Sequence, residues 1–522
     1  MTRTERRGPV RPARRASRHA DRILRASIAL VAASVMLSGC LYAAIPENAT
    51  PSVPTIDDPT SLDAFYAQEV SWSTCGSFEC AMVAAPLDWE DPSAGSIGLS
   101  VIRSVATGPD RIGSLLTNPG GPGASGVALV RDSLDFAVGS ALQESYDIIG
   151  FDPRGVGEST AVRCFDAADM DAYLYDLPAN PRGSAEWEAE LADRNTAFAE
   201  ACEANSQGIL PFITTINAAR DMDLLRAVLG DDEMHYLGYS YGTFLGATYA
   251  ELYPDNVGRM VLDGAIDPSI SGLDVGTEQA IGFENALRAY MTDCLTTQEC
   301  PFRGSVDQAM ADLGALLASV DRTPLPASDG RELGADSLVT GIIAALYSQA
   351  NWPILTRALS EALQGDPETA FRLADFYNGR DGGVYADNSA EAFRAYNCMD
   401  YPVDGSQADQ DASDARIAAE APTIAPYWAG PDVCEVWPYE PTGTRGPIAA
   451  AGAAPILVVG TTGDPATPYA WSVALAEQLE SGTLVTNVGE GHTGYNKGNA
   501  CVDDAVEAYL IDGTVPPDDL CS

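Results

Sequence analysis

The sequence is poor in basic residues and in histidine, and this shortage already excludes some functions. Its 522 residues contain 30 Lys+Arg against 74 Asp+Glu, which gives a formal net charge of −44, and only 3 His. Because a charge of this sign repels phosphate backbones, nucleic-acid binding is excluded. With so few histidines and no Cys-x-x-Cys pair, we predict no metal site and no cofactor. The hydrophobic fraction of 46% is that of a globular protein.

The amino terminus has an apolar run that is too short to span a bilayer, residues 26–39. It follows a basic segment with nine Arg in residues 1–25 and ends in LSGC at 37–40. This pattern predicts an export signal, and its end resembles the lipobox of bacterial lipoproteins, in which the Cys carries the lipid. We therefore expect a signal peptide at 1–39, a membrane lipid anchor on Cys40 and a Pro-rich tether at 40–66. An ordinary secretory signal with an incidental Cys is the alternative.

The cysteine content agrees with export. Of the 11 Cys, ten remain if Cys40 is lipidated, and an even number in an oxidising compartment suggests up to five disulfides. Sequence alone cannot determine how they pair. Our hypothesis joins nearest neighbours along the chain: Cys75–Cys80, Cys164–Cys202, Cys294–Cys300, Cys398–Cys434 and Cys501–Cys521.

Apolar, β-rich runs alternate with helical patterns in two parts of the chain. The runs are IGLSVIRSV, GSLLTNPGG, YDIIGFDPRG, MHYLGYS and GRMVLDG in the first part, and PILVVGTTGD and TLVTNVGEGH in the second. This alternation predicts an α/β protein with a parallel, doubly wound sheet. The residues between the two parts have mainly helical spacing. We therefore expect a core at 67–265, an inserted helical lid at 266–430 and the rest of the core at 431–522.

The segment Gly238-Tyr239-Ser240-Tyr241-Gly242 lies between a predicted strand and a predicted helix. A tight turn at this point would raise the Ser240 hydroxyl above the sheet, and glycines on both sides avoid a clash of Cβ atoms with the backbone. The five-residue pattern alone is weak. Its position between strand and helix predicts that Ser240 is a nucleophile.

A serine nucleophile needs a base, and outside the signal peptide the chain offers only His235 and His492. His235 falls within the strand before the turn, where a structural role is expected. His492 lies in a Gly-rich loop after the last strand, so it is the expected base. Asp464 follows the preceding strand, 28 residues earlier, and the order serine, acid, histidine is that of the α/β-hydrolases. The alternative for Asp464 is a turn or capping residue.

The Gly-rich segment NPGGPG, residues 118–123, follows another predicted strand. Glycines allow backbone N–H groups to approach a developing oxyanion. We expect the oxyanion hole to consist of the amides of Gly121 and Tyr241. An ordinary Gly/Pro turn is the alternative.

Several motifs carry a family resemblance: NPGGPGASG (118–126), GFDPRGVGEST (150–160), GYSYGT (238–243), VLDGAIDP (261–268), NCMD (397–400), CEVWP (434–438), GTTGDPATP (460–468) and GEGHTGYN (489–496). With these motifs the chain resembles the exported actinobacterial tripeptidyl aminopeptidases, in the proline iminopeptidase-like branch of the α/β-hydrolases, from about residue 65 to the end. NPGGPG departs from the HGGPG of intracellular iminopeptidases, which agrees with the exported branch. The resemblance implies an α/β-hydrolase fold with an inserted helical lid and a TAP-like C-terminal part. It also implies a serine peptidase that cleaves near a free amino terminus through an acyl-enzyme.

Such a peptidase would hold the substrate ammonium with a carboxylate, for which Asp400, Glu278 and Glu284 are candidates. Asp152 and Arg154 are expected to stabilise the loop beside the site rather than to bind substrate. Two other classes stay open: a carboxylesterase or lipase that uses the same triad, and an inactive, lipid-tethered binding protein.

Overall fold

The computed structural model of the chain describes residues 52–56, 59–402, 405–428, 430–443, 445–518 and 521. The expected signal peptide, Cys40 and the first part of the expected tether lie outside these described residues. Within the described ranges, no helix combines the length and the apolar character that crossing a membrane requires.

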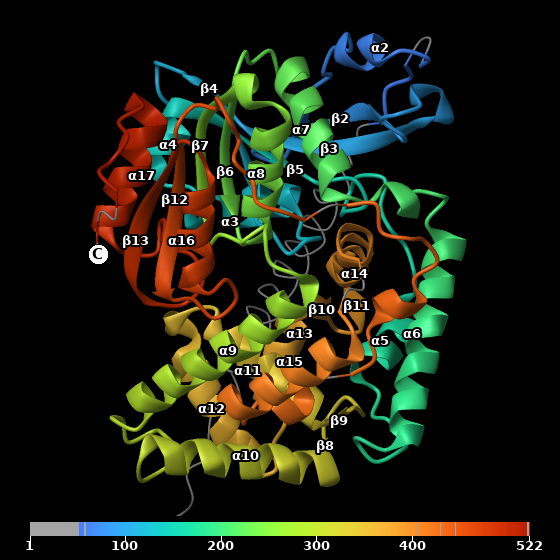
Figure 1. The fold of residues 1–522 in the computed structure, drawn as a ribbon, viewed down its shortest axis with the longest axis vertical. Coiled ribbons are helices and arrows are strands. Elements are labelled where there is room, and N and C mark those ends of the chain that lie inside the picture. Colours follow the sequence, from blue (N-terminus) through green and yellow to red (C-terminus); the bar gives the residue numbers. More distant parts are fainter. Residues whose placement is uncertain are drawn as a thin grey trace, which may run out of the picture. The chain divides into compact units, whose positions relative to one another are not determined.

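A nine-stranded sheet forms the centre of the fold (Figure 1). Six strands, β5 to β13 in spatial order, run parallel, and β1 to β3 are antiparallel at one edge. In spatial order the strands are β1 (Ser73–Cys75), β2 (Phe78–Pro86), β3 (Ser96–Ser104), β5 (Tyr146–Phe151), β4 (Gly113–Asn118), β6 (Met234–Tyr239), β7 (Val257–Asp263), β12 (Ile456–Gly463) and β13 (Gly482–Glu490). This confirms the expected, mostly parallel sheet of an α/β-hydrolase.

Helices cover both faces of the sheet, because its central strands are apolar on both sides. On one face, α3 (Gly126–Ala137), α4 (Ser140–Ser145) and α17 (Ala500–Asp512) share a buried cluster with the strands. On the other face the cover is α7 (Thr215–Leu229), α8 (Tyr241–Leu252) and α16 (Tyr469–Gln478). The short α2 (Leu62–Tyr66) packs beside α7 and β2. The sheet is therefore doubly wound, as predicted.

A helical segment, residues 272–420, lies between β7 and β12 in the sequence and has a buried cluster of its own. It contains α9 (Gly272–Cys294), α10 (Val306–Arg322), α11 (Ala335–Leu346), α12 (Trp352–Ala362), α13 (Glu368–Tyr377), α14 (Ser389–Asp400) and α15 (Gln407–Glu420). Two short hairpins join it, β8–β9 (Leu325–Pro326, Glu332–Leu333) and β10–β11 (Arg380–Asp381, Val384–Tyr385).

Two helices that precede β6 pack against the helical segment, which the sequence did not predict. They are α5 (Ala167–Tyr175) and α6 (Ala185–Asn205). Asp171 of α5 makes a two-pronged ion pair with Arg380, and Tyr175 belongs to the buried cluster of the helical segment. The cover over the sheet edge is thus built from two insertions rather than one.

The five expected disulfides are all present, each between nearest neighbours along the chain. Disulfides persist in oxidising compartments, so these pairs indicate an exported protein. The pair Cys398–Cys434 ties the end of α14 to the short 3₁₀ helix η6 (Val433–Val436). The other pairs are Cys75–Cys80, Cys164–Cys202, Cys294–Cys300 and Cys501–Cys521.

Candidate active site

Ser240 occupies a sharp turn between β6 and α8, with φ 56° and ψ −126°. A positive φ is unusual for a residue with a side chain and marks a backbone that its surroundings hold in place. A Cβ on Gly238 would lie 2.5 Å from the carbonyl oxygen of Gly242, and a Cβ on Gly242 would lie 2.8 Å from that of Asn118. Both flanking glycines are therefore required by close backbone packing. Ser240 itself is partly exposed.

His492 and Asp464 form a hydrogen-bonded pair at the ends of β13 and β12. Nδ1 of His492 lies 2.9 Å from each carboxylate oxygen of Asp464, whose side chain is fully buried. Asp464 also accepts hydrogen bonds from the amides of Ala466 and Thr467, which fix its orientation. Burial lowers the pKa of His492, but the charge and hydrogen bond of Asp464 outweigh it, so the net pKa is raised. The imidazole is thus oriented and made more basic, as a general base requires.

The turn at Ser240 and the imidazole are connected through the end of β7. The amide of Ser240 donates to the carbonyl of Asp263, 2.9 Å away. The next residue is Gly264, where an added Cβ would lie 3.2 Å from Cε1 of His492. Nε2 of His492 is buried and has no hydrogen-bond partner among the described residues. The turn at Ser240 and the ring of His492 thus both lie against the end of β7, and Asp464 is hydrogen-bonded to that ring, at the carboxyl ends of the parallel strands.

Asp263 contributes to the site, although the sequence analysis did not assign it a role. Its buried carboxylate accepts hydrogen bonds from the amides of Gly494 and Tyr495, just after His492. Burial, partly offset by those amides, raises its pKa to about 6. The residue shapes the loop that carries the imidazole. The signal in the sequence that could have pointed to Asp263 is its position at the end of a predicted strand, in the motif VLDG.

The NPGGPG loop rests directly on the serine turn. A Cβ on Gly120 would lie 2.8 Å from Cβ of Ser240 and 2.9 Å from the amide nitrogen of Tyr241. The amide of Gly120 is already used, since it donates to Oδ1 of Asn118. The amides of Gly121 and Tyr241, in contrast, have no acceptor within the described part of the chain. These two N–H groups are available to an oxyanion.

The helical segment touches the imidazole. The amide of His492 donates to the carbonyl of Tyr347, 2.9 Å away, and the two rings meet edge to face with centroids 5.2 Å apart. The loop after α11 therefore takes part in holding the expected base. No residue of the helical segment belongs to the predicted triad.

The structure buries two of the three predicted ammonium ligands. Asp400 is 3% exposed and receives the amide and the hydroxyl of Thr215. Glu284 is 1% exposed and receives the amide and the hydroxyl of Thr423. Both carboxylates use their oxygens inside the fold, which argues against a role in binding an ammonium group. The sequence showed that acids were present, but not which distant residues would contact them.

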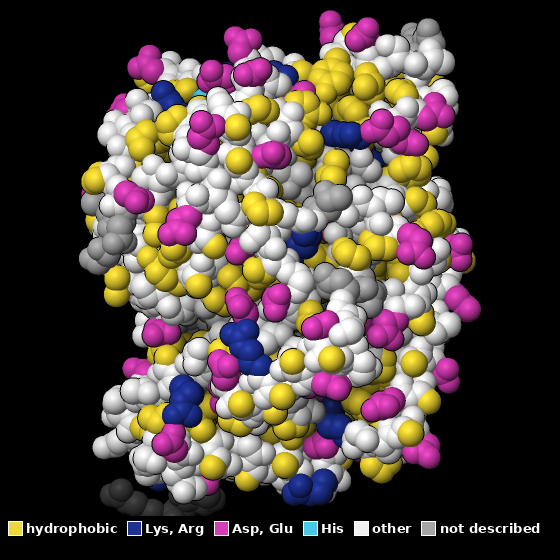
Figure 2. All heavy atoms as spheres, viewed as in Figure 1, with side chains coloured by type: hydrophobic (Ala, Val, Ile, Leu, Met, Phe, Trp, Pro, Cys, Tyr) yellow, Lys and Arg dark blue, Asp and Glu magenta, His cyan; other side chains and the backbone are white. Residues whose placement is uncertain are grey.

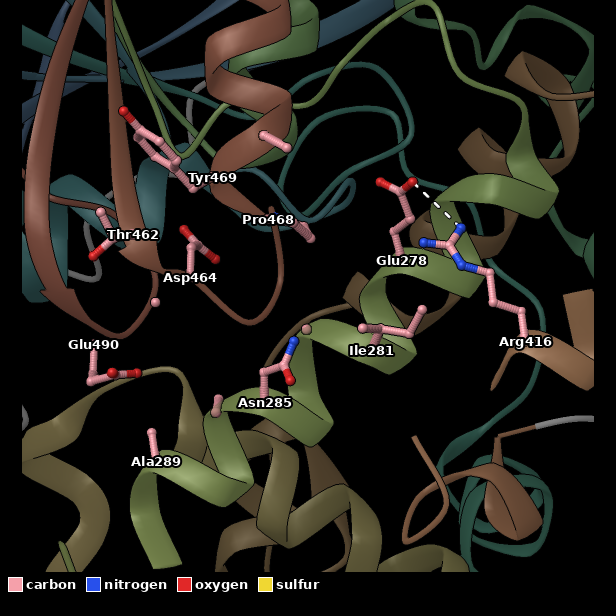
Figure 3. Close-up of a pocket in the computed structure, with 14 residues that line it drawn as sticks. Glu278, Ile281, Asn285, Ala289, Arg416, Thr462, Asp464, Pro468, Tyr469 and Glu490 are labelled. Carbon is pink, nitrogen blue, oxygen red and sulfur yellow. Dashed lines mark ion pairs between the residues drawn. The ribbon is translucent and has the colours of Figure 1, made fainter. Parts of the chain in front are cut away.

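Glu278 is the accessible candidate, and it lines a cavity of about 440 Å³ (Figure 3). Its carboxylate accepts a hydrogen bond from Trp471 and lies 3.7 Å from Arg416. The cavity lies between α9 and the ends of β12 and β13 and reaches Asp464, but neither Ser240 nor His492 lines it. The lining is Glu278, Ile281, Gly282, Asn285, Ala286, Ala289, Arg416, Thr462, Gly463, Asp464, Pro468, Tyr469, Ala470 and Glu490.

Three other sequence assignments agree with the contacts. Arg154 makes a fully buried ion pair with Asp221, 2.7 Å apart, and Asp152 accepts hydrogen bonds from residues at the start of α3. His235 accepts the amide of Arg259, as a structural residue would. In the described part of the chain, no group of three His, Cys, Asp or Glu side chains could hold a metal ion.

An α/β-hydrolase sheet with a serine on a strained turn and a histidine–aspartate pair beside it defines a serine hydrolase. A family model described as TAP-like protein matches residues 421–521. Serine protease Hip1 of Mycobacterium tuberculosis H37Rv is 36% identical over 94% of this chain and 95% of its own. Carboxylesterase B of the same strain is 39% identical over 93% of this chain and 97% of its own. Tripeptidyl aminopeptidase of Streptomyces lividans is 30% identical over 86% of each chain. The chain belongs to the tripeptidyl aminopeptidase family of serine hydrolases.

Proposed function

We propose that the protein is an exported serine peptidase that cleaves peptide bonds near a free amino terminus. The hydrogen-bonded pair of His492 and Asp464 beside the strained turn at Ser240 is the observation that carries this proposal. The names of two relatives, serine protease Hip1 and tripeptidyl aminopeptidase, support peptides as the substrate. The surface agrees with a cationic substrate terminus, since acidic side chains outnumber basic ones (Figure 2).

The proposed mechanism gives these groups the roles that a serine, histidine and aspartate have in serine hydrolases. Ser240 Oγ attacks the scissile carbonyl while Nε2 of His492 accepts its proton, and Asp464 stabilises the imidazolium through Nδ1. The amides of Gly121 and Tyr241 donate to the oxyanion of the tetrahedral intermediate. The imidazolium then protonates the leaving amine, which departs and leaves an acyl-enzyme. Water attacks this ester by the same route and releases the acyl part.

The specificity for a free amino terminus would rest on Glu278. It is the one predicted ammonium ligand that stays accessible, and it reaches a cavity that also contains Glu490. The guanidinium of Arg416 lies 3.7 Å from the carboxylate of Glu278. The ammonium group of a substrate would therefore have to displace Arg416 from this carboxylate. Glu278→Gln is expected to raise KM for a substrate with a free terminus and to leave an acetylated substrate unaffected.

The decisive experiment uses a chromogenic tripeptide amide, once with a free and once with an acetylated amino terminus. The enzyme is residues 41–522, and Ser240→Ala is the control. Cleavage of the free form alone, lost in Ser240→Ala, supports the aminopeptidase. Equal cleavage of both forms rejects the requirement for a free terminus and, with it, the role of Glu278.

A carboxylesterase is the second candidate function, because the relative with 39% identity is named carboxylesterase B. The same triad can hydrolyse esters, so the fold does not separate the two activities. Hydrolysis of a short acyl ester together with failure on both tripeptide amides would favour the esterase.

The lipid anchor is a further part of the proposal, supported by LSGC at residues 37–40. Expressed from the full-length gene in a bacterial host, the protein is expected in the membrane fraction with a diacylglycerol on Cys40. The substitution Cys40→Ala should release it or block its processing. A membrane-bound, unlipidated wild type would contradict the anchor.

A further inference from the structure

A buried chain of hydrogen bonds connects the end of α14 to the residue that follows Ser240. Oγ1 of Thr215 donates to Oδ2 of Asp400 over 2.6 Å, and the amide of Thr215 donates to Oδ1 over 2.8 Å. The phenol of Tyr241 is hydrogen-bonded to the same Thr215 hydroxyl. A hydroxyl has a single proton, so the Thr215 hydroxyl that donates to Asp400 accepts from the phenol of Tyr241. We call Asp400, Thr215 and Tyr241 the Asp400 network.

All three members of the network are held firmly. Their residues are 3%, 1% and 3% exposed, so water does not compete for these hydrogen bonds. Tyr241 also packs its ring against Tyr396 of α14, with centroids 5.8 Å apart. Behind Asp400, a Cβ on Gly443 would lie 2.6 Å from the Cα of Asp400, so the two backbones approach each other closely. In such surroundings the position of the Tyr241 phenol is tied to that of α14.

The other end of α14 contacts the second half of the oxyanion site. A Cβ on Gly123 would lie 2.8 Å from the carbonyl oxygen of Ser389 and 3.0 Å from the amide nitrogen of Phe393. Gly123 closes the loop that contains Gly121. Figure 1 shows α14 between the sheet with its helices and the rest of the helical segment. One helix therefore contacts both segments whose amides we expect to form the oxyanion hole, the NPGGPG loop and the start of α8.

We propose that Asp400 is a positioning residue of the oxyanion site, which acts through Thr215 on Tyr241. The hydrogen bonds fix the phenol, and through it the first residue of α8, whose amide would stabilise the oxyanion. This inference rests on the proposed function, because it assumes Ser240 as nucleophile and the Tyr241 amide as donor. Since the oxyanion exists only near the transition state, disruption should lower kcat and leave KM nearly unchanged.

The test measures kcat, KM and Tm for Tyr241→Phe, Thr215→Val and Asp400→Asn, with active sites counted by a serine-directed phosphonate. Tyr241→Phe and Thr215→Val should lower kcat per labelled site roughly 10- to 100-fold, because small misplacements of catalytic groups have effects of this size. Asp400→Asn should also lower kcat, but by a smaller factor. The amide oxygen of Asn can replace one of the two carboxylate oxygens that accept hydrogen bonds from Thr215. Thr215→Ser keeps the hydroxyl and should restore kcat.

The matched control is Tyr249→Phe, which removes another buried phenol from the same helix, one that contacts Asp223. It should lower Tm and leave kcat unchanged. A double variant Tyr241→Phe/Thr215→Val that is no slower than either single variant would support one connected network.

Two results would overturn the inference, and they differ. If Tyr241→Phe and Thr215→Val keep kcat within about twofold of wild type while Tm falls, the network only stabilises the fold. If wild type itself neither reacts with the phosphonate nor hydrolyses amide or ester, the proposed function fails and this inference fails with it.

Discussion

The carboxyl ends of the strands and the helical segment contribute different things to one site. The strand ends supply the proposed reacting groups. Close backbone packing around glycines positions Ser240, and hydrogen bonds orient His492 and Asp464. The helical segment supplies none of them, yet it contacts the proposed base, His492, through Tyr347 and the NPGGPG loop through α14. The comparison teaches that an inserted segment can contact, and so help to position, groups that another part of the fold supplies.

The largest effect should come from the strand ends. Asp464→Asn should lower kcat about 10⁴-fold, because the imidazole loses its orientation and the partner of its cation. The pH profile sharpens the result. In wild type, kcat/KM should rise with pH through a midpoint above about 6.5, because the pKa of His492 is raised. In the variant this midpoint should move down, because the carboxylate charge is gone.

The matched control for this variant is Asp504→Asn, which changes an exposed acid of α17 that also follows a strand of the sheet. Its kcat and pH profile should equal those of wild type. A full rate in Asp464→Asn would remove this residue from the triad.

The next largest effect is expected from Gly123→Ala, which tests whether the helical segment contributes to catalysis. Gly123→Ala would force a Cβ against the backbone of α14 at a φ of +100°. We expect kcat to fall roughly 10- to 100-fold from displacement of the oxyanion loop. Gly276→Ala in α9, where nothing lies within 4 Å of the new Cβ, is the control. It should leave kcat unchanged and raise stability by about 0.5–1 kcal/mol, because alanine favours the helix. Equal kcat in both variants would mean that the contact between α14 and the NPGGPG loop does not contribute to catalysis.

The strand-end part of the site could be predicted from sequence because its signals are local. The apolar runs, the glycines around Ser240 and the position of Asp464 after a strand each occupy a few consecutive residues. The strand β2 was missed, because FECAMVAAP is rich in residues that also suit helices, and pairing with β3 determines its structure.

The contacts of the helical segment could not be predicted, because they join distant residues. Asp400 receives the hydrogen bonds of Thr215, which lies 185 positions earlier in the chain. Asp171 pairs with Arg380 across 209 positions. A sequence shows that a carboxylate exists, whereas its exposure depends on which of many donors the fold brings to it. For this reason the sequence could not show that Asp400 and Glu284 are buried and hydrogen-bonded within the fold.

The disulfides allow a test of stability against activity. Replacing Cys398 and Cys434 by Ser frees the end of α14, two residues before Asp400. Replacing Cys501 and Cys521 frees the C-terminal end of the chain. Each double variant should lose about 2–5 kcal/mol of unfolding free energy. Only the first should also lower kcat per labelled site, and an unchanged kcat there would separate α14 from catalysis. Denaturant unfolding and active-site titration measure the two quantities.

The smallest effect is a difference in how the two regions respond to pH. Burial raises the pKa of Asp263, at the strand ends, to about 6. The hydrogen bond of Arg380 lowers that of Asp171, which pairs with the helical segment. A raised carboxyl pKa means that stability falls as pH rises from about 4 through the folded value, because the unfolded chain loses its proton first. A lowered pKa means that stability is present above about 4 and is lost as pH falls.

The stability advantage of wild type over Asp263→Asn should therefore shrink between pH 4 and 7. Its advantage over Asp171→Asn should instead grow between pH 3 and 5, by less than about 1 kcal/mol, since that pair is partly exposed. Denaturant unfolding across this range measures both slopes. Slopes of the same sign would mean that Asp263 is stabilised as an anion by the amides of Gly494 and Tyr495 more than burial destabilises it. The loop of His492 would then be an anion-binding turn, and its hold on the imidazole would strengthen rather than weaken as pH rises.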